Sequence, residues 1–307
     1  MPQSLQSQRI IITGATGLVG KPLTKSLEQA GAKVIRAVRR PVRDQQTELF
    51  WDPEKGEIDA AKFDGADAVV HLAGENIAGH RWTKAFKKKI LDSRVKGTRL
   101  ISETIARAVN RPRTFVCASA IGYYGNRDDT TLAEAAPPAN DFLGQVCQQW
   151  EAACQPARDA EGVRVVNARI GVILSPAGGA LKKMLTPFKF GLGGKIGDGR
   201  QFMSWIALDD VVGAIVHILA NADVSGPVNL VAPTPVTNGD YTKTLGRVLG
   251  RPTIFPMPAF AAKLAFGEMA DALLLSSTRV VPQALQAARY EFKYPALEPA
   301  LRHLLNK

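Results

Sequence analysis

Residues 9–20, with the sequence RIIITGATGLVG, constrain the fold of this chain more than any other segment. The β-branched run 10–12 is typical of a buried strand, and glycines follow it with the spacing G-x-x-G-x-x-G at Gly14, Gly17 and Gly20. Apolar residues then recur every four positions, as on the buried face of a helix. We interpret the segment as a strand, a glycine turn and a helix N-terminus, where bare backbone and free N–H groups accept a pyrophosphate.

The composition is that of a globular protein: 307 residues, of which 46% are hydrophobic and 22% charged. This length suffices for one large α/β domain or two unequal lobes. No apolar run reaches the length of a membrane span and no secretory signal is evident, so we expect a cytoplasmic protein with no membrane partner. Three cysteines, Cys117, Cys147 and Cys154, suit a reducing compartment, and their spacing predicts no metal site.

The net charge of +11 favours anionic ligands. Basic residues are scattered and lack interleaved aromatic residues, and the densest cluster, in 84–99, is expected on one face of a helix. We therefore expect no nucleic-acid partner. A phosphorylated cofactor would account for part of the excess charge.

The next strand is expected over 33–40 and ends before Pro41. In a dinucleotide-binding unit, the residue at the end of this strand meets the adenosine ribose, where a carboxylate suits NAD and an arginine suits NADP. Arg39 and Arg40 occupy this position, and we expect no carboxylate beside them. The pair predicts NADP, because guanidinium groups form charge-assisted bonds to a 2′-phosphate; the alternative is an ordinary solvated strand end.

Strands and helices alternate along the rest of the chain, which predicts a doubly wound parallel sheet of the Rossmann type with a small C-terminal substrate lobe. We expect a dinucleotide-binding domain over 8–232, to which 175–205 add part of the substrate lobe, and the C-terminal lobe over 233–307. His71 is interpreted as a core residue and 126–140 as a polar flap. Further strands are expected at 48–51, 66–74, 114–119, 163–174, 202–206 and 227–231, and helices at 83–109, 142–157, 178–190, 210–220 after an Asp209 cap, and from an Asn238 cap to Gly250.

Several motifs resemble those of the extended short-chain dehydrogenase/reductases: residues 13–20 (TGATGLVG), 72–74 (LAG) and 119–125 (SAIGYYG). Residues 73–78 (AGENIA) and 191–194 (GLGG) are similar to an atypical subfamily within the NAD-dependent epimerase/dehydratase family, and the similarity extends through the C-terminal lobe. The resemblance implies a Rossmann core with NADP in the crevice. It implies cofactor contacts at Gly14, Thr16, Gly17, Leu18 and Val19 in the turn, Arg39 and Arg40 at the 2′-phosphate, Leu72, Ala73 and Gly74 at the ribose, Lys89 and Arg94 from the long helix, and Ser119, Val172 and Ile173 near the nicotinamide.

The acid–base set of the wider superfamily is missing. Its Tyr-x-x-x-Lys motif, in which lysine lowers the pKa of the tyrosine, falls on Leu143 and Cys147, and the preceding Ser or Thr falls on Ala120. A leucine transfers no proton, and a neutral thiol supplies no positive field. The resemblance implies that the atypical subfamily as a whole lacks the same acid–base set.

Two hypotheses for the function stay open. The first is an NADP-dependent oxidoreductase or epimerase on a small molecule, in which Tyr123 or Tyr124, with Ser119, replaces the missing acid. The alternative for both tyrosines, which the sequence slightly favours, is that they are packing aromatic residues in the flap. Glu75 and Arg200 are the candidate substrate-binding residues. The second is a non-catalytic NADP(H)-binding protein that reports redox state to a partner. Either a monomer or a homodimer is compatible with the sequence.

Overall fold

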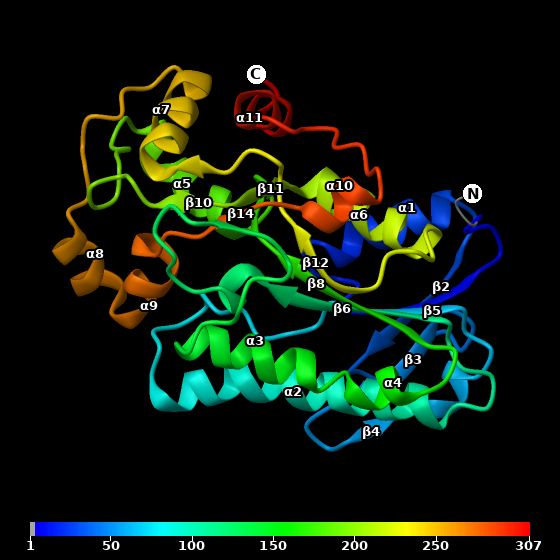
Figure 1. Ribbon diagram of the computed structural model, residues 1–307. Helices are drawn as coiled ribbons and strands as arrows, with labels where there is room; N and C mark the ends of the chain where they lie inside the picture. Colours follow the sequence, from blue (N-terminus) through cyan, green and yellow to red (C-terminus); the bar gives the residue numbers. More distant parts are fainter. Residues whose placement is uncertain (1–3) are drawn as a thin grey trace.

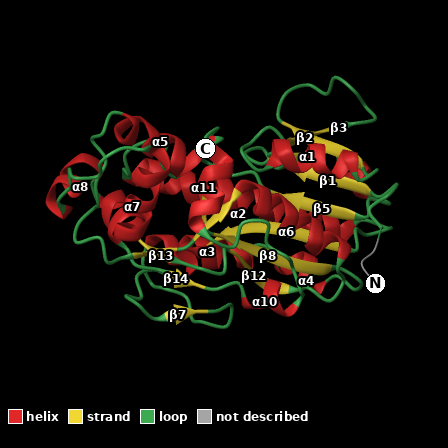
Figure 2. Ribbon diagram, turned by 90° about the horizontal axis from the view of Figure 1, so that it is seen from above, coloured by secondary structure: helices red, strands yellow, loops and turns green. Residues whose placement is uncertain are grey.

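An eight-stranded sheet forms the centre of the computed structural model, which describes residues 4–307 (Figures 1 and 2). Its strand order is β12-β8-β6-β5-β1-β2-β3-β4. All neighbours are parallel except β3 and β4, which pair antiparallel at one edge. The strands are β1 (Arg9–Thr13), β2 (Lys33–Val38), β3 (Glu48–Asp52), β4 (Glu57–Ile58), β5 (Ala68–His71), β6 (Thr114–Ala120), β8 (Arg164–Ile170) and β12 (Gly226–Leu230).

Strand β1 lies in the middle of the sheet and pairs with β2 on one side and β5 on the other. Ile11 is in register with Ile35 of β2 and with Val69 of β5, and all three side chains are buried. The chain thus turns first to one side of β1 and then to the other. In open α/β sheets the crevice at such a switch point, beyond the carboxyl ends of the strands, is the usual ligand site. The glycine turn after β1 opens into this crevice.

Helices cover both faces of the sheet, as the alternating pattern predicts. In Figure 1, α1 (Gly20–Gln29) and α6 (Leu208–Ala220) lie above the sheet, whereas α2 (Lys84–Arg107), α3 (Phe142–Ala152) and α4 (Gln155–Asp159) lie below it. Each layer has its own apolar core, one centred on Ile12 and Leu23 and the other on Ile11 and Ile101. The doubly wound Rossmann class predicted from the sequence is confirmed.

A smaller lobe lies beyond the carboxyl ends of the strands. Its core joins α5 (Gly179–Lys189), α7 (Asn238–Leu249) and α11 (Leu297–Leu305) around the buried side chains of Trp205 and Tyr241. The division of the chain at residue 232 stays a prediction. The remaining elements are η1 (Ala60–Phe63), η2 (Ile121–Tyr123), β7 (Thr131–Leu132), β9 (Val172–Leu174), β10 (Phe202–Met203), β11 (Trp205–Ala207), β13 (Val236–Thr237), α8 (Ala259–Phe266), α9 (Glu268–Ala270), η3 (Asp271–Leu275), β14 (Arg279–Val280) and α10 (Gln283–Ala287).

The strand expected over 163–174 is two strands. It breaks at Gly171, where a Cβ atom would lie 2.7 Å from the Ser204 carbonyl oxygen, and β9 then leaves the main sheet to pair with β11. The expected strand 202–206 is likewise divided, at Ser204, into β10 and β11. The helix expected over 142–157 is divided into α3 and α4, with Pro156 in the first turn of α4. No helix separates β2 from β3.

Both predicted helix caps are wrong by one or two positions. Helix α6 begins at Leu208 after Ala207, so Asp209 lies in its first turn and favours the helix through its charge. Helix α7 is capped by Thr237, whose hydroxyl accepts from the Asp240 N–H at 3.1 Å. The segment 126–140 is mostly loop, as expected, but contains β7, which pairs with β14 from the C-terminal region.

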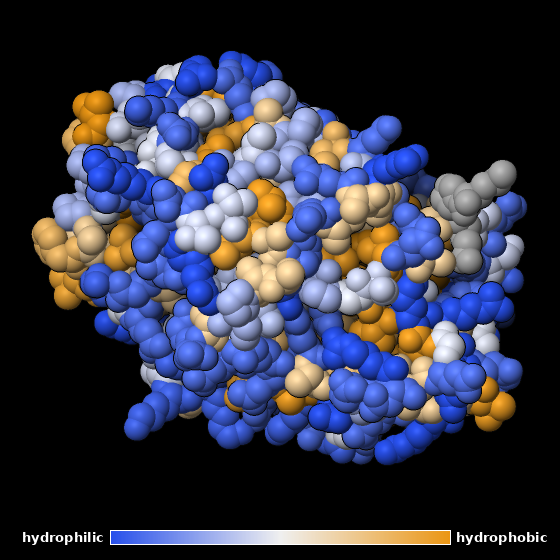
Figure 3. Space-filling view, in the orientation of Figure 1, coloured by the Kyte–Doolittle hydropathy of each residue, from blue (hydrophilic) through white to orange (hydrophobic). Residues whose placement is uncertain are grey.

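Exposed apolar side chains gather on the smaller lobe. Phe260 and Leu264 of α8 are 74% and 79% exposed, and Phe190, Ile254 and Phe255 lie on neighbouring segments of the lobe. Figure 3 shows this apolar surface at the left edge, where Figure 1 places α8. Within residues 4–307, no helix combines the length and apolar character required to cross a bilayer.

Candidate functional site

The glycine turn brings the N-terminus of α1 against the end of β5. Gly14 has a left-handed backbone (φ +69°), and a Cβ atom on it would lie 3.0 Å from the Ala73 nitrogen. A Cβ on Gly20 would lie 2.1 Å from the Gly14 carbonyl oxygen. Val19 precedes the helix and no side chain caps it within residues 4–307. The turn therefore presents bare backbone and uncapped N–H groups, which is what a pyrophosphate requires.

The Thr13 hydroxyl fixes the opposite side of the crevice. Its oxygen accepts from the backbone N–H groups of Leu72 at 3.2 Å and Ala73 at 3.3 Å, and it lies 2.6 Å from Nδ1 of His71. Because the oxygen already accepts twice, it donates its proton to His71. His71 is buried, as predicted, and this role of Thr13 escaped the sequence reasoning.

At the end of β2, the two arginines have different surroundings. Arg39 is exposed, whereas Arg40 forms an ion pair with Glu48 of β3, Nη2 to Oε1 at 2.6 Å. Arg40 and the backbone N–H of Arg43 both bond to Glu48 and lower the pKa of its carboxyl to about 2. The expectation of no carboxylate beside these arginines is wrong, because the parallel pairing of β2 with β3 brings Glu48 to them.

The segment after β5 connects helix α2 to the smaller lobe. The backbone N–H of Glu75 donates to the Ser93 hydroxyl oxygen at 3.1 Å, and the Glu75 carboxylate pairs with Lys89 at 2.8 Å. Lys183 of α5 donates to the Ala78 carbonyl at 2.8 Å. Two of the predicted ligands, Glu75 and Lys89, are thus bound to one another, and the lobe is held over the carboxyl ends of the strands.

A buried polar network lies behind the end of β6. Ser119 donates to Oε1 of Glu151 at 2.7 Å, and Arg169 donates to both oxygens of the same carboxylate at 2.8 and 2.9 Å. The guanidinium carbon of Arg169 lies 3.5 Å from the centroid of the Tyr123 ring. Ser119 and Tyr123, two of the predicted catalytic residues, are therefore held by the same arginine and carboxylate.

Tyr124 belongs to the interior. Its side chain is fully buried, and its hydroxyl donates to Asn229 at 2.7 Å and accepts from Arg169 at 3.0 Å. Burial raises the pKa of this phenol. Tyr123 is only half-buried, so the two adjacent tyrosines differ in how far each is open to a ligand.

Leu143 and Cys147, to which the sequence comparison with the superfamily motif points, lie on α3, below the end of β6. A Cβ on Gly122 would meet the Leu143 side chain at 3.2 Å and the Cys147 sulfur at 3.9 Å. Cys147 is buried, and burial raises the pKa of its thiol to about 12, so the thiol stays neutral. The two residues form an apolar, uncharged surface.

Other predicted ligands lie at the glycine turn or at the lobe. The Leu18 side chain packs against Gly178, at the start of α5, which directly follows the strand with Val172 and Ile173. Arg200 is exposed in a loop of the lobe, where its N–H donates to Asp198 at 2.9 Å. Within residues 4–307, no cluster of His, Cys, Asp and Glu side chains has the arrangement of a metal site.

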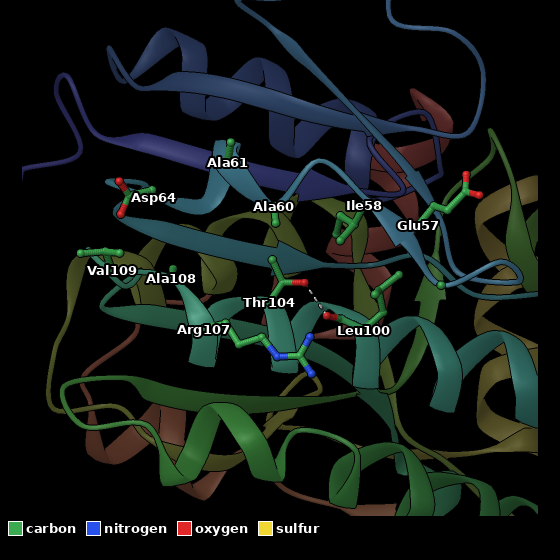
Figure 4. A pocket seen from close by; sticks show the side chains of 11 residues that line it. Glu57, Ile58, Ala60, Ala61, Asp64, Leu100, Thr104, Arg107, Ala108 and Val109 are labelled. Atoms are coloured by element: carbon green, nitrogen blue, oxygen red, sulfur yellow. Dashed lines mark hydrogen bonds between the residues drawn. The ribbon is translucent and has the colours of Figure 1, made fainter.

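A separate hollow lies away from the glycine turn. It measures about 660 Å³ and is open to solvent between η1 and the C-terminal half of α2 (Figure 4). Ile58, Leu100 and Val109 supply apolar lining, and Glu57 and Arg107 lie at its margin. This hollow faces the amino ends of β5 and β6, so it is not the crevice beyond their carboxyl ends.

The sheet order, the glycine turn and the crevice at the switch point define a Rossmann-type dinucleotide-binding protein. A model of the NAD dependent epimerase/dehydratase family matches residues 10–231, and one described as Domain of unknown function (DUF1731) matches residues 257–304. The chain belongs to the NAD dependent epimerase/dehydratase family. The resemblance to atypical extended short-chain dehydrogenase/reductases is confirmed.

Relatives cover the whole chain. Epimerase family protein Mb2239 of Mycobacterium bovis is 45% identical over 298 residues, 97% of this chain and 98% of that protein. The crystal structure of human epimerase family protein SDR39U1 with NADPH is 34% identical, with a TM-score of 0.90 over 98% of this chain and 100% of that one. A nucleoside-diphosphate sugar epimerase from Corynebacterium glutamicum is 37% identical, with a TM-score of 0.82 over 99% of this chain and 59% of that one.

Proposed function

We propose that this chain binds NADP(H) in the crevice between β1 and β5 and uses it in oxidoreductase or epimerase chemistry on a small substrate. The observation that carries the proposal is the close approach of Gly14 to Ala73, where a Cβ on Gly14 would lie 3.0 Å from the Ala73 nitrogen, beside a helix N-terminus without a side-chain cap. The turn fits the cofactor, because the lack of a side chain at Gly20 lets the helix start directly against the turn. A Cβ on Gly20 would lie 2.1 Å from the Gly14 carbonyl oxygen and would push the two apart. The human relative with NADPH supports the assignment.

Particular residues would hold each part of the cofactor. The turn residues Gly14, Thr16, Gly17, Leu18 and Val19 would hold the pyrophosphate, and Arg39, with Arg40, the 2′-phosphate. Leu72, Ala73 and Gly74 would line the ribose, Lys89 and Arg94 would approach from α2, and Ser119, Val172 and Ile173 would lie near the nicotinamide. The bound cofactor supplies a hydride donor or acceptor.

The cofactor preference can be tested by calorimetry. Arg39→Glu combined with Arg40→Ala is expected to weaken NADPH binding far more than NADH binding, because each lost charge-assisted bond costs on the order of 1.5–3 kcal/mol. Equal losses for both coenzymes would refute the assignment to NADP. Absence of heat with either coenzyme in the unmodified protein would refute the cofactor site itself.

For catalysis, Tyr123 is the better candidate acid of the adjacent tyrosines. Its ring is half-buried on Arg169, whereas the Tyr124 hydroxyl is committed to Asn229 and Arg169 in the interior. With carbonyl compounds and nucleoside-diphosphate sugars as trial substrates, Tyr123→Phe is expected to lower turnover while NADPH affinity is retained. Tyr124→Phe is the matched control and is expected to change the free energy of unfolding rather than turnover. Turnover unchanged in Tyr123→Phe would remove this residue from the chemistry.

A non-catalytic redox-sensing protein is the second candidate function. The apolar Leu143 and the neutral Cys147, in the motif positions, favour it. It predicts that NADPH and NADP⁺ change the association of the protein with itself or with a partner. Sedimentation of the protein with each coenzyme and the turnover assay separate the two candidates. If neither coenzyme changes the association of the protein and turnover is observed, the sensor is rejected.

A further inference from the structure

Arg94 reaches from helix α2 to the end of β5. A Cβ atom on Gly74 would lie 3.6 Å from the guanidinium carbon of Arg94, and that carbon lies 5.0 Å from the centroid of the Trp150 ring on α3. Its Nη1 donates to the Ile90 carbonyl at 3.1 Å. The guanidinium group therefore lies between the strand that faces the glycine turn and the helix that carries the missing motif.

The anionic groups around Arg94 are already committed to other cations. Glu75 pairs with Lys89 at 2.8 Å, and Glu151 accepts two bonds from Arg169. The Cys147 thiol is neutral, since burial raises its pKa to about 12. Within residues 4–307, no carboxylate bonds to the Arg94 guanidinium. Burial lowers the pKa of Arg94, as expected for a cation whose charge is only partly balanced.

The chain thus lacks a lysine at position 147 but places a guanidinium group against the same helix, next to Trp150. The superfamily lysine supplies a positive charge beside the nicotinamide ribose. We propose that Arg94 supplies this charge from α2 and makes the site bind the reduced cofactor more tightly than the oxidised one. The inference rests on the proposed cofactor site.

The physical reason is the charge of the nicotinamide ring. The oxidised ring carries a positive charge and the reduced ring is neutral, whereas the phosphates and riboses of the two forms are the same. A fixed cation near the ring therefore repels only the oxidised form. The ratio of the dissociation constants for NADP⁺ and NADPH isolates this effect from contacts that both forms share.

The test measures both dissociation constants by calorimetry for the full chain and four variants. Arg94→Met removes the charge, Arg94→Gln removes it while keeping a donor for the Ile90 carbonyl, and Arg94→Lys keeps it. Arg99→Met is the matched control, because Arg99 is an exposed arginine on the same helix and its loss changes the net charge equally. Thermal unfolding establishes that each variant is folded.

We expect the two neutral variants to lower the ratio by on the order of tenfold, the effect of one nearby charge at the dielectric of a protein surface. Arg94→Lys should keep most of the ratio, and Arg99→Met should leave it unchanged. A ratio that stays the same in Arg94→Gln, while NADPH still binds, would overturn the role of Arg94 and leave the cofactor site intact. Failure of the unmodified protein to bind NADPH would instead overturn the proposed function.

Discussion

Arg40 donates two hydrogen bonds to the carboxylate of Glu48, from Nη2 at 2.6 Å and from Nη1 at 3.0 Å. The pair lies at the end of β2, where the 2′-phosphate of NADP is expected. Arg40 is therefore already engaged with an anion, whereas Arg39 is exposed and free of this carboxylate. The sequence does not distinguish the two arginines, but in the structure Arg39 is more available than Arg40 to bind a phosphate.

The difference predicts unequal effects of single substitutions on NADPH affinity. Arg39→Ala should weaken NADPH binding by about tenfold or more, the loss of one charge-assisted bond. Arg40→Ala should have a smaller effect, because Glu48 offsets its charge. Calorimetry with NADPH measures both, and NADH, which lacks the 2′-phosphate, is the control. Glu48→Gln should tighten NADPH binding, and a larger loss in Arg40→Ala than in Arg39→Ala would contradict this account.

A methyl group at Gly20 should damage both stability and cofactor binding. The added Cβ would lie 2.1 Å from the Gly14 carbonyl oxygen, so turn and helix must separate. We expect Gly20→Ala to lower the free energy of unfolding by about 1–3 kcal/mol, as overpacking does, and to weaken NADPH binding.

Gly56→Ala is the control for this substitution. Gly56 has a φ of +72° but no atom within 4 Å of its added Cβ. Its replacement should cost about 1 kcal/mol of backbone strain without changing NADPH affinity. Urea unfolding and calorimetry measure the two effects, and full NADPH affinity in Gly20→Ala would show that the close approach is not required.

The sequence predicted the parts of the fold that local patterns determine. The buried run at 10–12, the glycine spacing and the alternation of strands and helices led to the correct class. The exact starts of two helices were missed. Helix α6 begins after Ala207, which supplies no side-chain cap, and α7 begins after Thr237, one residue before the predicted cap at Asn238. The break at Gly171 was missed because its cause, the Ser204 carbonyl, lies on another strand.

In the site, the missed features all depend on partners distant in the chain or on pairing between strands. Glu48 meets Arg40 only because β2 and β3 pair in parallel. Thr13 binds the Leu72 and Ala73 N–H groups across 59 and 60 residues, and the sequence contains no local signal for it. Arg169 lies within a strand whose sequence pattern does not indicate an ion pair, because its partner Glu151 comes from another element.

The ion pair of Glu151 with Arg169 should be strongly coupled energetically. The two side chains are only 12% and 4% exposed, so removal of one partner leaves the other charge without compensation. We expect Glu151→Leu and Arg169→Met each to lower the free energy of unfolding by about 3–5 kcal/mol. The double variant should lose at least about 1 kcal/mol less than the sum, as interacting residues do.

Urea unfolding of the unmodified protein, the two single variants and the double variant measures this double-mutant cycle. Ser119→Ala, which removes only the hydroxyl that donates to Glu151, is a milder comparison and should cost about 1 kcal/mol. Additive losses in the double variant would show that the two charges do not depend on one another.

His71 should make the stability of the protein depend on pH. Burial lowers the pKa of its imidazole from 6.5 to about 3. Below pH 6.5 the unfolded chain therefore binds a proton that the folded protein excludes. The stabilisation is complete above the unfolded pKa and is lost as the pH falls toward the folded one, at about 1.4 kcal/mol per pH unit from this residue alone.

His71→Gln removes this titration and keeps an acceptor for the Thr13 hydroxyl. Between pH 6 and pH 4, the free energy of unfolding measured in urea should therefore fall less steeply in His71→Gln than in the unmodified protein. His80→Gln, at an exposed histidine, should retain the original slope. Equal slopes for all three proteins would mean that His71 takes up a proton in the folded state, and its Nδ1 could then no longer accept the bond from Thr13 that fixes the end of β5.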